Sequence, residues 1–106
     1  MSIQFVYDDR LGIRLPELDE PWESHPSETQ IKILAEWETI RGSIPDRIKQ
    51  LDQMIREKQQ KMDLETDFPI CCRLNYEISE LASCITDLHL WYRMNQEITE
   101  HAPSHL

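Results

Sequence analysis

Two apolar stripes in the sequence constrain the fold of this chain more than any other feature. The first stripe contains Ile44, Ile48, Leu51, Ile55 and Met62, and the second contains Cys71, Leu74, Ile78, Leu81, Ile85 and Leu88. Both advance mainly by steps of three and four residues, which is the spacing of a helix that packs along another helix. If the chain reverses near Thr66, the stripes face each other as Ile44 with Leu88, Ile48 with Ile85, Leu51 with Leu81, Ile55 with Ile78, and Met62 with Cys71. Each pair of position numbers adds up to 132 or 133, as an antiparallel register requires. The stripes therefore predict a mainly helical protein built on a long antiparallel helical hairpin, with coiled-coil packing.

The two helices of this hairpin are expected to differ in length. They should span about 44–62 and about 69–98, with Asp67 as the N-cap of the second helix and Pro69 in its first turn. The last turns of the second helix then extend beyond the start of its partner. A further element must cover the apolar residues of those turns.

A shorter first helix over about 28–41 is the natural cover. Ser27 and Gln30 fit a capping box at its start, and Gly42 should end it. Ser43 would then cap the next helix. The alternative is a single helix that continues through Gly42–Pro45 with a kink.

Residues 3–15 alternate apolar and polar side chains on both sides of a turn at Asp8–Arg10, which predicts a short β-hairpin. The expected cross-strand pairs are Tyr7 with Leu11, Phe5 with Ile13, and Ile3 with Leu15. This register would place six apolar side chains on one face. An extended arm without a partner strand is the alternative, because an isolated two-stranded hairpin is marginal in water.

The chain is expected to form a single domain over 1–106. Its organisation is an arm and acidic proline-rich linker over 1–27, a helical core over 28–98, and a frayed tail over 99–106. The linker holds one large apolar residue, Trp22, among acids and prolines. It serves either to pack back on the helices or to recognise a partner.

Charge and cysteine content bound the function classes. The net charge is −9, with the first hairpin helix mildly basic and the second acidic, which suits complementary flanks of a helix pair better than a nucleic-acid site. Three cysteines argue against a disulfide framework. No signal peptide opens the chain and no apolar run is long enough to span a membrane. We therefore expect a cytoplasmic protein that binds neither nucleic acid nor membrane.

The sequence contains no convincing motif for chemistry. Cys71 and Cys72 are adjacent and point about 100° apart on a helix, and Cys84 lies nearly four turns from Cys71, so the thiols do not converge as zinc requires. The histidines are His25, His89, His101 and His105, and none is placed to activate a cysteine. Two glycines cannot form a phosphate-binding loop. We expect no enzyme activity, no cofactor and no metal.

These patterns favour a non-enzymatic protein–protein interaction module, an adaptor or regulator, whose partner the sequence does not identify. The candidate contact residues are Trp22, Leu90, Trp91 and Met94, because the second hairpin helix is broadly apolar near its end and aromatic residues are enriched at interfaces. A homodimer through Leu90, Trp91 and Met94 is expected, and added salt should tighten it by screening the net charge. One alternative is an acidic nucleic-acid mimic that inhibits a nucleic-acid-binding protein. Another is a thiol redox sensor that uses Cys71, Cys72 or Cys84.

Overall fold

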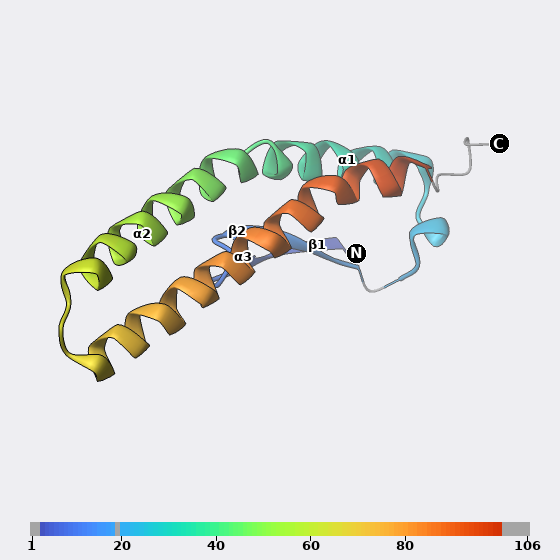
Figure 1. Ribbon diagram of the computed structural model, residues 1–106. Helices are drawn as coiled ribbons and strands as arrows, with labels where there is room; N and C mark the ends of the chain where they lie inside the picture. Colours follow the sequence, from blue (N-terminus) through green and yellow to red (C-terminus); the bar gives the residue numbers. More distant parts are fainter. Residues whose placement is uncertain (1–2, 19, 101–106) are drawn as a thin grey trace.

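The computed structural model of the chain describes residues 3–18 and 20–100, and the side chains of residues 5–17 and 20–93. The elements in order are β1 (Ile3–Asp8), β2 (Ile13–Leu18), the short 3-10 helix η1 (Trp22–Ser24), α1 (Ser27–Arg41), α2 (Ile44–Leu64) and α3 (Phe68–Glu100). Figure 1 shows α1 and α2 end to end as one bent rod, with α3 returning beside them and the β-hairpin behind the helices. The predicted helical hairpin, the shorter first helix and the N-terminal β-hairpin are confirmed.

The interface between α2 and α3 contains the two predicted stripes. Every residue of both stripes is buried or half-buried, and Ile44, Leu51, Leu74 and Leu88 are buried. The Lys58 ammonium lies 2.9 Å from the Glu77 carboxylate, so one ion pair joins basic α2 to acidic α3. The stripes therefore identify the packed faces of both helices.

The last turns of α3 lie against α1, as expected. The indole of Trp37, which is 1% exposed, meets the indole of Trp91 edge to face with ring centres 5.8 Å apart. Arg41 lies over the ring of Tyr92 at 4.2 Å, and its Nε donates a hydrogen bond to the Tyr92 carbonyl at 2.7 Å. Aromatic and cation–π contacts thus fix the shorter helix on the longer one.

The register of the β-hairpin differs from the prediction. The observed pairs are Asp8 with Ile13, Tyr7 with Arg14, Val6 with Leu15, Phe5 with Pro16, Gln4 with Glu17, and Ile3 with Leu18. The reason is a four-residue loop at 9–12, in which Gly12 adopts a φ of 77°. Asp8 holds this loop: its carbonyl accepts the N–H of Gly12 at 2.7 Å and its carboxylate accepts the N–H of Leu11 at 2.8 Å. The expected single apolar face is therefore wrong, and Tyr7 is exposed.

The loop of the β-hairpin inserts into the helical core. Leu11 and Ile13 belong to one buried cluster with Trp37, Ile40, Ile44, Leu51, Cys84 and Leu88. The guanidinium of Arg47 in α2 donates to the Leu11 carbonyl at 2.9 Å. On the α3 side, Arg10 donates to Asp87 at 2.7 Å and to Ser83 at 2.9 Å. The β-hairpin is thus the cover for the broad apolar face of α3.

The junction between α1 and α2 combines features of the two alternatives, a break at Gly42 and a continuous kinked helix. Helix α1 ends at Arg41 before Gly42, as predicted, but Gly42 and Ser43 both keep right-handed backbone angles. The chain therefore bends without changing direction sharply (Figure 1). Ser43 is not a side-chain cap, since its hydroxyl instead donates to the Ile40 carbonyl at 2.6 Å.

The other helix ends give mixed outcomes. The capping box is wrong, because Ser27 is already the first residue of α1 and the Gln30 amide donates to the Trp22 carbonyl at 2.9 Å. Asp67 caps α3 as predicted, since its carboxylate accepts the N–H of Ile70 at 3.3 Å. Helix α3 continues to Glu100, past the expected end, and residues 101–106 lie outside the described residues.

Candidate interaction surface at the end of the helical hairpin

The four predicted contact residues have different surroundings. Trp22 is half-buried in η1, and its indole N–H has no hydrogen-bond partner among the described residues. Trp91 is half-buried against Trp37, so much of its ring serves the core. Leu90 is 50% exposed, and the side chain of Met94 lies outside the described residues. Contact through these residues stays a prediction.

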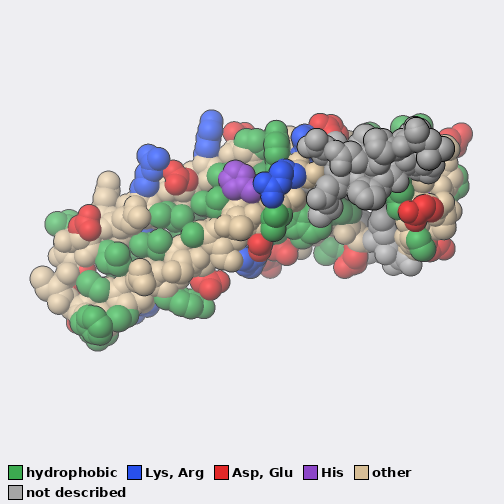
Figure 2. All heavy atoms as spheres, turned by 45° about the vertical axis from the view of Figure 1, so that its right-hand side comes forward, with side chains coloured by type: hydrophobic (Ala, Val, Ile, Leu, Met, Phe, Trp, Pro, Cys, Tyr) green, Lys and Arg blue, Asp and Glu red, His purple; other side chains and the backbone are tan. Residues whose placement is uncertain are grey.

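Large apolar side chains are instead exposed where α2 turns into α3, a region of residues 58–77 that we call the tip. Leu64 is 86% exposed, Phe68 75% and Tyr76 64%. Figure 1 shows only α2 and α3 at this end, because the β-hairpin packs behind the middle of the helices and α1 lies at the other end. Apolar side chains are visible at this end among polar ones in the space-filling view (Figure 2). The sequence predicted only a bend between the helices here, because Leu64 and Phe68 fall outside both stripes.

A groove runs between α2 and α3 along the tip. Its outer part is a hollow of about 470 Å³ lined by Lys58, Lys61, Leu64, Glu65, Ile70, Arg73, Leu74 and Glu77. Its inner part is a hollow of about 280 Å³ lined by Arg10, Lys58, Tyr76, Glu77, Glu80, Leu81 and Cys84. Both parts share Lys58 and Glu77, so the groove continues from the β-hairpin loop toward the bend. We call the outer part the tip groove.

The charges of the tip groove differ from those of the chain as a whole. A hydrogen bond from Lys58 lowers the pKa of Glu77, and the nearby charges of Lys58, Arg73 and Lys61 lower it further. In the part of the chain with described side chains, Lys61 and Arg73 take part in no ion pair. A chain of net charge −9 therefore presents, in the tip groove, two cations without an ion-pair partner among the described side chains.

The bend next to the groove has the opposite character. Residues 63–68 read Asp-Leu-Glu-Thr-Asp-Phe, in which three acids alternate with exposed Leu64 and Phe68. The Asp63 side chain is exposed, whereas Asp67 caps α3 and Glu65 accepts the N–H of Asp67 at 3.0 Å. The bend is thus an acidic and apolar segment held in a fixed conformation.

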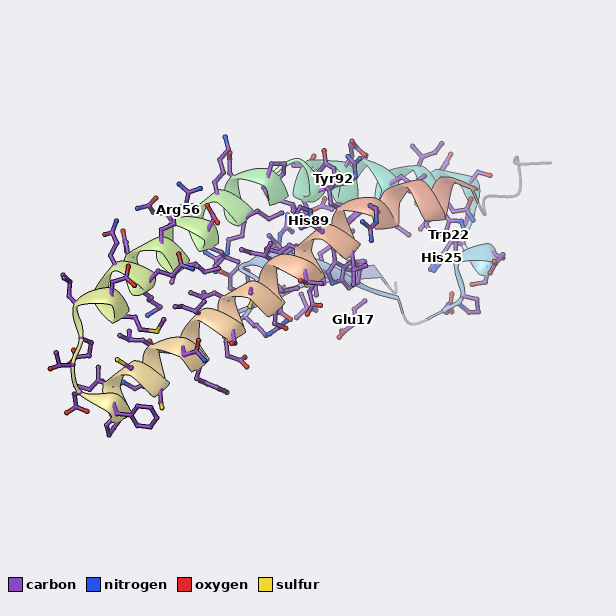
Figure 3. The ribbon with its side chains drawn as sticks, in the orientation of Figure 1. Glu17, Trp22, His25, Arg56, His89 and Tyr92 are labelled. Carbon is purple, nitrogen blue, oxygen red and sulfur yellow. The ribbon has the colours of Figure 1, made fainter. Side chains whose placement is uncertain are left out.

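A second hollow lies on the face turned away from the β-hairpin. It measures about 370 Å³ and is lined by Pro45, Ile48, Lys49, His89 and Tyr92. Figure 3 shows His89 and Tyr92 on the near side of the helices, with the β-hairpin behind them. Its lining is mostly apolar.

The candidate residues for chemistry are dispersed. Cys71 is half-buried, Cys72 is exposed and Cys84 is buried, and all three are free thiols. His25 is buried in the linker, where its Nε2 lies 3.3 Å from the Glu20 carbonyl. Within residues 3–18 and 20–100, no three His, Cys, Asp or Glu side chains gather where a metal ion could bind. His101 and His105 lie outside that range.

Two surface properties bear on the other classes of partner. On the face shown in Figure 2 the acidic side chains are scattered among basic and apolar ones and form no continuous acidic surface. None of the described helices is both long enough and apolar enough to cross a lipid bilayer.

Comparison with protein-family models, with curated proteins and with solved structures gave no match to this chain. The candidate surface therefore rests on the geometry above.

Proposed function

We propose that this protein is a non-enzymatic interaction module, an adaptor or regulator, and that it binds a protein partner through the tip of its helical hairpin. The observation that carries this proposal is the exposure of Leu64 and Tyr76, which line the two parts of the groove, and of Phe68 at the start of α3. Exposed apolar side chains that cluster beside a groove are typical of interaction surfaces, whereas single ones are common anywhere on a protein.

The shape of the molecule supports the same role. The extents are 59 × 24 × 18 Å, and the buried cluster ends at Leu51 in α2 and at Cys84 in α3. The tip therefore projects from a packed body as a two-helix arm. A partner can reach the end of such an arm because the rest of the chain does not cover it.

The cytoplasm is the compartment we propose. All three cysteines are free thiols, although Cys71 and Cys72 are neighbours in sequence and Cys72 is exposed. Thiols in this state suit a reducing environment.

Affinity capture with matched variants tests the proposed function. The tip variant replaces Leu64 and Phe68 by Gln, and the control replaces Ile31 by Gln, because Ile31 is 66% exposed on α1 away from the tip. Both changes remove exposed apolar surface and leave the net charge unchanged, so circular dichroism should match the parent. We expect the tip variant to lose partners that the parent and the control retain. Equal recovery of every partner by all three proteins would refute a contact role for the tip.

A further inference from the structure

We infer that the tip binds the tip of a second copy of this chain, with the acidic bend of each copy seated in the basic tip groove of the other. This inference rests on the proposed function, because it names the partner of the same surface. It places the homodimer contact at the bend between α2 and α3 and away from Leu90.

Charge complementarity indicates which segment binds in the tip groove. The tip groove is lined by three cations and two carboxylates, Glu65 and Glu77, and by Ile70 and Leu74. Lys58 pairs with Glu77, whereas Lys61 and Arg73 take part in no ion pair among the described side chains. A matching segment needs carboxylates spaced between large apolar side chains. The bend of the same chain has this composition, with Asp63 beside the exposed Leu64. One surface thus carries both halves of a contact, which is the requirement for a two-fold dimer.

The dimensions of the tip permit the exchange. Glu77 lies nine positions after Phe68 in α3, which corresponds to about 14 Å at a rise of 1.5 Å per residue. Two antiparallel tips that overlap by this length bring each bend alongside the groove of the other copy. The outer part of the groove, about 470 Å³, is large enough to accept an apolar side chain.

Net charge does not prevent this arrangement. The acids of η1 and α1 lie toward the opposite end of a molecule 59 Å long (Figure 1). Repulsion between exposed charges is screened over about 8–10 Å at physiological ionic strength. Two copies joined at their tips keep these acids apart. Added salt should therefore weaken the tip contact, whereas it would tighten a dimer through Leu90.

A charge-exchange experiment tests the inference on the full chain. Variant one carries Lys61→Glu and Arg73→Glu, so that both groove and bend are acidic. Variant two carries Asp63→Lys and Glu65→Lys, so that both are basic, and it retains the Asp67 cap. The control carries Lys32→Glu and Lys49→Glu, which change exposed lysines outside the tip. Circular dichroism verifies folding of each protein, and sedimentation equilibrium measures association up to about 1 mM, the weak end of specific affinities.

The inference predicts which of these proteins form dimers. The parent and the control should form dimers, and each tip variant alone should associate at least about tenfold more weakly, because like charges then face each other. An equimolar mixture of variants one and two should dimerise again, since each groove meets a bend of opposite charge. In the parent, amide shifts that depend on concentration should lie within residues 58–77.

Other outcomes overturn the inference. A parent that stays monomeric at all concentrations excludes the second copy as the occupant, and so do shifts that cluster around Leu90. A mixture of variants that fails to associate excludes the exchange of charges between groove and bend. If the parent is monomeric but loses a captured protein when Leu64 and Phe68 are replaced, the proposed function stands and the occupant is a foreign partner.

Discussion

Gly12 holds the loop of the β-hairpin in the left-handed region, and the Arg47 guanidinium lies where a Cβ at this position would project. The same guanidinium donates to the Leu11 carbonyl at 2.9 Å, so loop and helix approach closely only because position 12 has no side chain. Gly42 has no such role: its φ is −63°, and a Cβ there would make ordinary contacts with carbonyl oxygens one turn earlier.

Alanine at these two positions should have opposite effects. Gly12→Ala combines a positive φ with a collision against Arg47, and should reduce the free energy of unfolding by about 1–3 kcal/mol. Gly42→Ala fits a right-handed backbone and should increase it by about 0.4–1 kcal/mol by restricting the unfolded chain. Urea denaturation of both variants beside the parent checks the pair. A Gly12→Ala variant as stable as the parent would show that the loop relaxes away from Arg47.

The same residue explains why the register of the β-hairpin was not predictable. Alternation over 3–15 indicated two strands correctly, but pairing depends on the length of the loop between them. Leu11 continues the apolar alternation of β2, yet it lies in the loop because Gly12 turns the chain and the core accepts Leu11. The buried site that accepts Leu11 is formed by α2 and α3, far along the sequence. The local pattern over 3–15 therefore could not reveal that Leu11 belongs to the loop.

At the scale of elements, helix spacing carried most of the predictable information. The stripes identify buried faces because an apolar side chain every three or four residues leaves one face that must be covered. Capping residues were less reliable. Asp67 acts as a cap because its carboxylate can only accept and takes the N–H of Ile70, whereas the hydroxyl of Ser43 donates to the Ile40 carbonyl.

The stability lost on truncating a side chain in the α2–α3 interface should increase with the burial of that side chain. Leu51 is 1% exposed and belongs to the buried cluster, so Leu51→Ala should cost about 2–5 kcal/mol. Leu81 is only half-buried at the inner end of the groove, and Leu81→Ala should cost less than Leu51→Ala. Thermal and urea unfolding measure both losses. Equal costs would mean that the groove beside Leu81 is closed in solution.

At the scale of the molecule, the tip was the part that sequence reasoning missed. Leu64 and Phe68 are apolar residues in a turn, and whether a turn is covered depends on where the other elements pack. The sequence predicted that α1 covers the last turns of α3, but it did not show whether the linker or the β-hairpin would lie over the bend. Contacts such as Trp37 with Trp91 place α1 at the end away from the tip and leave the tip exposed.

Small-angle scattering should detect this shape directly. The radius of gyration over Cα atoms is 18.2 Å. A compact chain of this length would have about 13 Å. We expect the value in dilute solution to approach the larger figure and to rise with concentration as tips pair, but not in the Lys61→Glu, Arg73→Glu variant. A value near the compact limit would mean that the helical arm folds back on the body.

The contact between the β-hairpin loop and α3 also has a consequence for biosynthesis. The Cys84 thiol lies 3.6 Å from the Arg10 carbonyl, across 74 positions of sequence. A ribosome therefore releases Leu11, Ile13 and the apolar face of α2 well before the helix that shields them exists. Contacts of such high sequence separation form late and slowly. Until α3 emerges these apolar residues stay exposed, and transiently exposed apolar surface of this kind favours aggregation during synthesis.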